Sequence, residues 1–135
     1  MDVIEKKRRK TMGEKEEKLM YFCTHACDDP EKASIPFVMA NAALAMDIKT
    51  TVVLQGNAVY LAKKGYVDNI LRGGGFPHIS KLMKDFMELG GELKVCVPCI
   101  GERHIPEEDL VEGAQTTAAG ALNVEALEAD ATFVY

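Results

Sequence analysis

Short apolar segments rich in β-branched residues alternate along this chain with segments of helical composition. The strand-like segments are residues 19–23, 48–54, 93–97, 115–118 and 131–135. The helical segments are residues 30–46, 77–89 and 123–129, with shorter helical turns at 58–64, 98–103 and 107–113. Strands that alternate with helices predict a parallel sheet with right-handed crossovers. We therefore expect an α/β fold with a doubly wound, mainly parallel sheet of about five strands and helices on both faces.

The first predicted helix contains an awkward proline and an apolar face. The aspartates just before Pro30 can cap this helix, and Pro30 suits its first position. An interior proline loses one backbone hydrogen bond and clashes with the preceding turn, so Pro36 either kinks the helix or moves its start to about Ser34. Residues 37–46 carry no charged side chain, and we expect a subunit interface to cover them.

Charge divides the chain into a tail and a body. Residues 1–17 are highly charged, so we expect a flexible N-terminal tail followed by one domain over residues 18–135. Residues 19–135 hold nine Lys or Arg and sixteen Asp or Glu, and this acidic balance disfavours nucleic acid as a partner. We see neither a signal peptide nor a stretch suited to span a membrane, so we expect a cytoplasmic protein.

Four cysteines occur in two pairs, and each pair falls where a predicted strand ends. Cys23 and Cys27 follow the first strand, with His25 between them where it can lower a thiol pKa, and Cys96 and Cys99 follow the third strand. Ligands of open α/β sheets bind at the carboxyl ends of the strands, and cytoplasmic thiols are kept reduced. The pairs therefore indicate catalytic, redox or metal roles. In the common strand order 2-1-3-4-5, strands one and three are neighbours and the two pairs meet in one crevice.

The position of Cys96 favours nucleophilic sulfur chemistry. A sulfur acceptor reacts as a thiolate, and backbone N–H groups at the start of a helix stabilise a thiolate. Cys96 ends the third strand before a helical turn opened by Pro98, and Cys99 lies in the first turn as a natural resolving thiol. Arg103 and His104 follow closely enough to line the crevice, where Arg103 can hold an anionic sulfur donor.

Several segments together resemble the DsrE/DsrF-like (TusD-like) sulfur-relay family. They are the first strand with its polar loop, the Ala-rich helix, and residues 51–54, 90–96 and 127–135. The resemblance covers roughly residues 18–135 and implies a flavodoxin-like domain that accepts sulfane sulfur on a cysteine and passes it to a partner protein. In that family the working cysteine lies at the end of the third major strand, which corresponds to Cys96 here.

The resemblance also implies an activity and partners. The activity is that of a sulfurtransferase or sulfur carrier that holds sulfur as a persulfide or thiosulfonate. The expected partners are sulfur donor and acceptor proteins, such as a TusA-like carrier or a rhodanese-like protein. We also expect a homo-oligomer, a trimer or a hexamer. No cofactor is expected.

Two alternatives use the same cysteines. Cys23, Cys27, Cys96 and Cys99 could supply four thiolates to a tetrahedral zinc ion. Cys96 and Cys99 could instead act as a thiol–disulfide redox pair on this scaffold. The position of the Cys-Val-Pro-Cys motif excludes a thioredoxin-like fold, because the motif follows a late strand and too few residues remain after it to complete such a fold.

Overall fold

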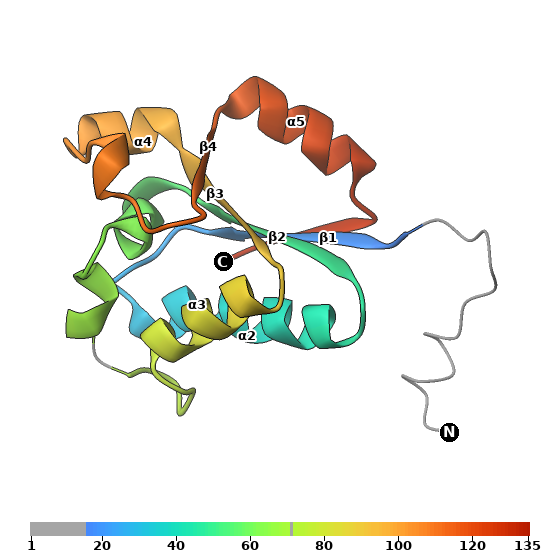
Figure 1. Ribbon diagram of the computed structural model, residues 1–135, viewed down its shortest axis with the longest axis horizontal. Helices are drawn as coiled ribbons and strands as arrows, with labels where there is room; N and C mark the ends of the chain where they lie inside the picture. Colours follow the sequence, from blue (N-terminus) through green and yellow to red (C-terminus); the bar gives the residue numbers. More distant parts are fainter. Residues whose placement is uncertain (1–15, 71) are drawn as a thin grey trace.

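A parallel sheet of five strands forms the centre of the computed structural model, which describes residues 16–70 and 72–135 (Figure 1). The strands are β1 (Lys18–Cys23), β2 (Lys49–Leu54), β3 (Glu92–Cys96), β4 (Gln115–Thr117) and β5 (Ala131–Val134). Their order across the sheet is β4-β3-β2-β1-β5, and every neighbouring pair is parallel. The predicted parallel sheet is confirmed.

Helices cover both faces of the sheet, as predicted. The helices are α2 (Pro30–Ala45), α3 (Ile79–Glu88), α4 (Val97–Glu102) and α5 (Ala119–Glu128). Three 3-10 segments complete the fold: η1 (Gly56–Ala62), η2 (Tyr66–Asn69) and η3 (Glu107–Asp109). Figure 1 shows α2 and α3 on one face and α5 on the other. Right-handed crossovers explain this layering, because β1, β2 and β3 step in one direction across the sheet whereas α5 carries the chain back from β4 to β5.

The strand order differs from the expected order 2-1-3-4-5. β2 lies between β1 and β3, and Val52 pairs with Tyr21 on one side and with Leu93 on the other. Two strand spacings put the carboxyl ends of β1 and β3 roughly 10 Å apart. Strand order depends on which strand edges meet in three dimensions, and the composition of a single strand carries no signal for that choice. The cysteines after β1 and β3 therefore lie on either side of the end of β2.

The helix α2 begins at Pro30 and continues through Pro36 without a break. The Asp29 side chain caps it by accepting a hydrogen bond from the backbone N–H of Lys32 at 3.1 Å. Ser34 lies within the first turns, where its hydroxyl donates to the Pro30 carbonyl at 2.7 Å. A start at Ser34 is therefore wrong, because the capping aspartate and a proline in the first turn already define the start of the helix.

The side of α2 that faces the sheet is covered within the chain, whereas Met39 on its outer side is 39% exposed, so the subunit interface expected over residues 37–46 stays a prediction. Phe37 and Ala40 are fully buried. The Phe37 ring packs edge-to-face against Phe86 of α3, with ring centroids 5.5 Å apart. Phe86 in turn lies against Gly91, where any side chain would collide with the aromatic ring. These contacts join α2, α3 and the start of β3 in one core.

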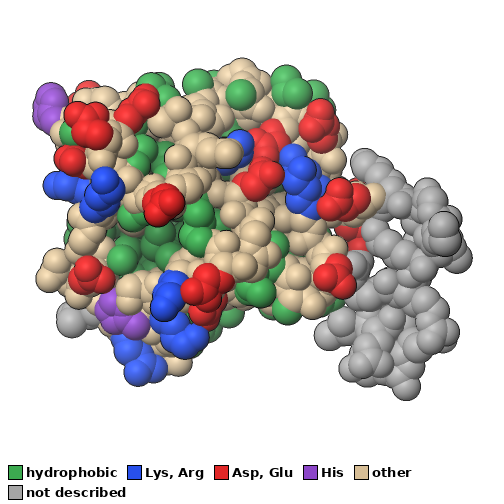
Figure 2. All heavy atoms as spheres, viewed as in Figure 1, with side chains coloured by type: hydrophobic (Ala, Val, Ile, Leu, Met, Phe, Trp, Pro, Cys, Tyr) green, Lys and Arg blue, Asp and Glu red, His purple; other side chains and the backbone are tan. Residues whose placement is uncertain are grey.

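More strongly exposed apolar side chains gather on α5 and β5, and Figure 2 shows part of this surface at its upper edge. Leu127 of α5 is 87% exposed and Val134 of β5 is 72% exposed. The opposite side of α5 buries Leu122 against Met20 and Val53 of the sheet. A helix that is apolar on both sides is typical of one that meets a second protein surface.

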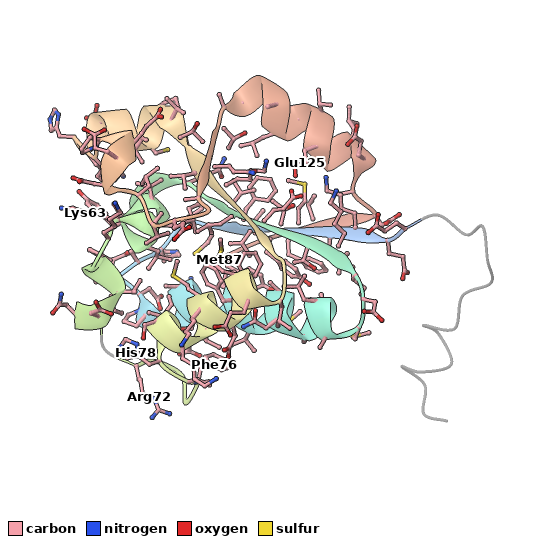
Figure 3. The ribbon with its side chains drawn as sticks, in the orientation of Figure 1. Lys63, Arg72, Phe76, His78, Met87 and Glu125 are labelled. Carbon is pink, nitrogen blue, oxygen red and sulfur yellow. The ribbon has the colours of Figure 1, made fainter. Side chains whose placement is uncertain are left out.

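A polar cluster holds α5 at the amino end of the sheet. Glu125 extends from α5 toward the strands (Figure 3), and its carboxylate lies 3.3 Å from Lys18 Nζ. The buried hydroxyl of Thr51 lies 3.2 Å from Glu125 and 3.4 Å from Glu92. These pairings satisfy polar groups under α5, at the end of the sheet opposite to the cysteines.

The chain that precedes β1 is described only from Glu16 onward. The predicted N-terminal tail, residues 1–17, therefore lies outside the described residues except for its last two. Among the residues that the structure describes, no helix has both the length and the apolar character needed to cross a membrane.

We expect Phe86→Ala to lower the free energy of unfolding by about 3–5 kcal/mol, because it leaves a cavity beside Phe37 and Gly91. Urea denaturation followed by circular dichroism measures the change. Leu89→Ala is the matched control, since Leu89 is 51% exposed, and its effect should stay below about 1 kcal/mol. Equal losses in the two variants would contradict this packing.

Candidate thiol site

Two thiols meet where β3 turns directly into α4. Cys96 is the last residue of β3 and precedes the first residue of α4, and Cys99 lies in the first turn of that helix. The Cys99 thiol donates to Cys96 Sγ, with the two sulfur atoms 2.7 Å apart. Both cysteines are free and half-buried. The pair is thus accessible to solvent and close enough to react internally.

The corner after β2 organizes the surroundings of this pair. The backbone N–H of Gln55 donates to the Cys23 carbonyl at 3.0 Å. The backbone N–H of Gly56 donates to Cys99 Sγ at 3.3 Å. Gly56 has a φ of 55°, a left-handed conformation that glycine adopts without strain. No local signal in the sequence connects Gly56 to Cys99, because the two residues meet only in the tertiary structure.

Arg103 is held beside the pair by three contacts. Its Nη1 donates to the Cys99 carbonyl at 3.1 Å, and its Nη2 donates to Asn57 Oδ1 at 3.1 Å. Its guanidinium carbon lies 5.9 Å from the centre of the Tyr60 ring. A planar cation stacked on an aromatic ring keeps a defined orientation. The structure thus places Arg103 beside the pair, whereas Asn57 and Tyr60 were not anticipated from the sequence.

The surroundings of Cys96 oppose ionisation in the resting state. Burial raises the pKa of the Cys96 thiol, and the neighbouring Cys99 thiol raises it further. A hydrogen bond from the Cys99 backbone and the charge of Arg103 lower the pKa but do not reverse the direction. This result differs from the stabilised thiolate expected at a helix start, because α4 is short and the thiol is partly removed from water.

The first cysteine pair is separated into a core residue and a surface residue. Cys23 is fully buried, and its Sγ donates to the His25 carbonyl at 3.5 Å. Burial raises the pKa of Cys23 to about 12. Cys27 is exposed, and its backbone N–H donates to the Tyr66 hydroxyl at 3.3 Å. Cys23 therefore acts as a packed side chain, not as a partner of the Cys96–Cys99 pair.

The four cysteines do not gather into one cluster. Among the described residues, no group of three or more His, Cys, Asp or Glu side chains is placed to hold a metal ion. The convergence expected from the order 2-1-3-4-5 is therefore absent, because β2 separates the ends of β1 and β3. Of the proposed donors, only Cys96 and Cys99 lie in direct contact.

The histidines take separate roles. The His25 ring pairs with Asp28 through Nδ1 at 2.7 Å, and among the described residues no hydrogen bond joins this ring to a cysteine side chain. His104 is exposed and has a φ of 54° just beyond α4. His78, labelled in Figure 3, precedes α3 and its Nε2 lies 2.8 Å from the Ile70 carbonyl oxygen, so its role is structural.

Comparison with known sequences identifies the family. The DsrE/DsrF-like family matches residues 17–135, and the chain belongs to this family. The uncharacterized protein MJ0760 of Methanocaldococcus jannaschii is 33% identical over 115 residues, which are 85% of this chain and 42% of MJ0760. The chain thus spans less than half of that relative. The uncharacterized protein MJ0989 of the same organism is 36% identical over 98 residues, which are 73% of this chain and 82% of MJ0989.

Solved structures agree with the fold. The YchN protein from E. coli matches with a TM-score of 0.74 and 18% identity, over 88% of this chain and 99% of YchN. The conserved protein of unknown function BT1422 from Bacteroides thetaiotaomicron matches with a TM-score of 0.64 and 13% identity, over 88% of this chain and 95% of its own. At such identities the likeness establishes the fold alone. The resemblance identified in the sequence is confirmed.

Alkaline pH tests the burial of Cys23. Its folded-state pKa is about 12 against an ordinary value of 9.0, so the unfolded chain ionises first. The stability contributed by the neutral buried thiol is complete below about pH 9 and is lost as the pH rises toward 12. Between about pH 8 and pH 10.5, we expect the wild-type chain to lose about 2 kcal/mol more unfolding free energy than Cys23→Ala.

Urea denaturation at each pH measures this difference. Cys27→Ser is the control, because it removes an exposed thiol, and it should follow the wild-type chain. If Cys23→Ala keeps the wild-type pH dependence, Cys23 ionises as an ordinary thiol and its assignment to the core fails.

Proposed function

We propose that this protein is a cytoplasmic sulfur-relay protein that accepts sulfane sulfur on Cys96, as a persulfide or a thiosulfonate, and passes it to a partner protein. The observation that carries the proposal is the half-buried Cys96–Cys99 pair at the end of β3, with sulfur atoms 2.7 Å apart. Membership of the DsrE/DsrF-like family supports a role in sulfur relay.

Loading requires a thiolate and a place for new negative charge. The Cys96 thiolate attacks the outer sulfur of a donor persulfide, the donor thiolate leaves, and Cys96 keeps the sulfane sulfur. Arg103 is the nearby cation, and its charge lowers the pKa of Cys96 against the effect of burial. A terminal persulfide or thiosulfonate is anionic, so the same guanidinium favours the loaded state. Arg103 therefore favours both the attack of the Cys96 thiolate on the donor and the retention of the anionic sulfur group on Cys96.

A partner protein must reach Cys96 to deliver or remove sulfur. Val97, the residue after Cys96, is 40% exposed, and Pro98 beside it is exposed as well. These side chains offer an apolar contact next to the reactive sulfur. A TusA-like carrier or a rhodanese-like protein is the class of donor or acceptor that we propose for this surface.

The loading test uses inorganic polysulfide as the persulfide donor and tetrathionate as the thiosulfonate donor. Intact-mass spectrometry should detect added sulfur on the wild-type chain, and a reductant should remove it. Cys96→Ser should abolish the stable adduct, because it removes the acceptor sulfur. Cys99→Ser should preserve or prolong it, because a resolving thiol no longer attacks the loaded cysteine.

Cys27→Ser is the control for loading, since it removes an exposed thiol outside the Cys96–Cys99 pair. Loading should survive this change. If sulfur still adds when both Cys96 and Cys99 are serine, yet is lost on changing Cys23 or Cys27, the active thiol belongs to the segment after β1 and the proposal fails. If Cys99→Ser abolishes loading and Cys96→Ser retains it, the roles are reversed.

Native mass spectrometry of protein purified without oxygen tests the predicted cofactor and assembly. We expect no bound zinc and a homo-oligomer, a trimer or a hexamer, held through the apolar surface of α5 and β5. Leu127→Glu should weaken the assembly, because Leu127 is 87% exposed and a charge there opposes apolar contact. One zinc ion per chain, lost when either cysteine pair is changed, would favour the zinc alternative. A monomer at micromolar concentration would contradict the oligomer.

A further inference from the structure

We propose that the Cys96–Cys99 pair has a second activity: it reduces its own bound sulfane sulfur and releases it as hydrosulfide. This inference rests on the proposed function, because it begins with a persulfide on Cys96. It differs from relay in its product, since relay hands sulfur to another protein whereas this step discharges sulfur into solution. The co-reactant that resets the pair is a dithiol reductant.

The step balances within the chain. Cys99 Sγ forms a bond to Cys96 Sγ, and the bond between Cys96 Sγ and the outer sulfur breaks. The electron pair of the broken bond leaves with the outer sulfur, which also takes the proton of the Cys99 thiol and departs as hydrosulfide. The outer sulfur is reduced and the Cys99 sulfur is oxidised, which leaves a Cys96–Cys99 disulfide. A dithiol then reduces this disulfide by ordinary exchange.

The resting geometry brings the reacting atoms together. Cys99 Sγ lies 2.7 Å from Cys96 Sγ, the sulfur that it attacks. The two sulfur atoms therefore need only a small approach to reach the bonded distance of about 2.05 Å. Two groups held in this way react with an effective concentration that no free thiol in solution reaches.

Contacts around Cys99 favour it as the attacking thiol. The Gly56 N–H donates to Cys99 Sγ at 3.3 Å, so it stabilises negative charge as the Cys99 proton leaves. Arg103 holds the Cys99 carbonyl at 3.1 Å while it is itself bound to Asn57 and stacked near Tyr60. The first turn of α4 is therefore held in place against the end of β2. Cys96 has no comparable contact with the β2 corner among the described residues.

A thiol can attack either sulfur of the persulfide, and the two attacks differ in the group that leaves. Attack on the outer sulfur expels the Cys96 thiolate, whereas attack on the inner sulfur expels hydrosulfide. Burial raises the pKa of Cys96, which makes its thiolate a poorer leaving group. When Cys99 is the attacking thiol, attack on the inner sulfur with release of hydrosulfide is thus favoured.

A single-turnover experiment tests this inference. The protein is loaded with polysulfide and freed of excess donor. It is then held without reductant while hydrosulfide is trapped with monobromobimane and the chain is followed by intact-mass spectrometry. We expect the wild-type chain to produce hydrosulfide and Cys96–Cys99 disulfide in equal amounts. Cys99→Ser, and Cys99→Ala as a second variant, should keep the persulfide and release hydrosulfide about 100-fold more slowly.

Two glycine variants separate the contact at Cys99 from general backbone strain. Gly56→Ala disturbs the amide that bonds to Cys99 and should slow hydrosulfide release about tenfold with loading retained. Gly90→Ala is the matched control, because Gly90 also has a positive φ, 88°, with open space around it, and it lies at the end of α3. Equal release rates in the two variants would overturn the role of Gly56 as a positioning residue.

The outcomes distinguish this inference from the relay proposal. If the Cys99 variants acquire no sulfur, both proposals fall. If they load sulfur but the wild-type chain holds its persulfide equally long, or releases hydrosulfide without forming the disulfide, only the release activity is refuted. Rapid appearance of disulfide and hydrosulfide in the wild-type chain, with a persistent persulfide in Cys99→Ser, supports both.

Discussion

The hydrogen-bonded register of β1, β2 and β3 is the constraint on which the thiol site depends. It pairs Leu54 with Cys23 on one side and with Val95 on the other, so the three strands finish at one edge. The residues after β2 then contact both neighbours, and Gly56 reaches Cys99 across the β3–α4 junction. A slip of one residue would turn the strand side chains to the opposite face and remove these contacts.

Environment, more than residue type, separates the four cysteines. Cys23 is a neutral core residue with a pKa raised to about 12, and Cys27 is exposed. Only Cys96 and Cys99 combine contact between sulfur atoms with access from solvent. We propose two fates for sulfur bound to this pair: transfer to a partner protein beside the exposed Val97, and discharge by Cys99.

Local features were predictable because they depend on near neighbours along the chain. The positions of the strands, the cap before Pro30 and the placement of Cys96 and Cys99 at a strand end and in the following turn all follow from composition and short-range backbone rules. Contacts between distant segments were not predictable in this way. The strand order, the burial of Phe37 under α3 and the contacts of Arg103 with Asn57 are of this kind.

The sequence by itself determined the α/β class, the family and the thiols available at the strand ends, because hydrophobic periodicity, turn residues and cysteine spacing are all local properties. The tertiary structure decided which thiols meet. Placing β2 between β1 and β3 separated Cys23 and Cys27 from Cys96 and Cys99, and it brought Gly56 to Cys99. Strand order depends on how helices pack on both faces of the whole sheet, and no single segment of the sequence contains that information.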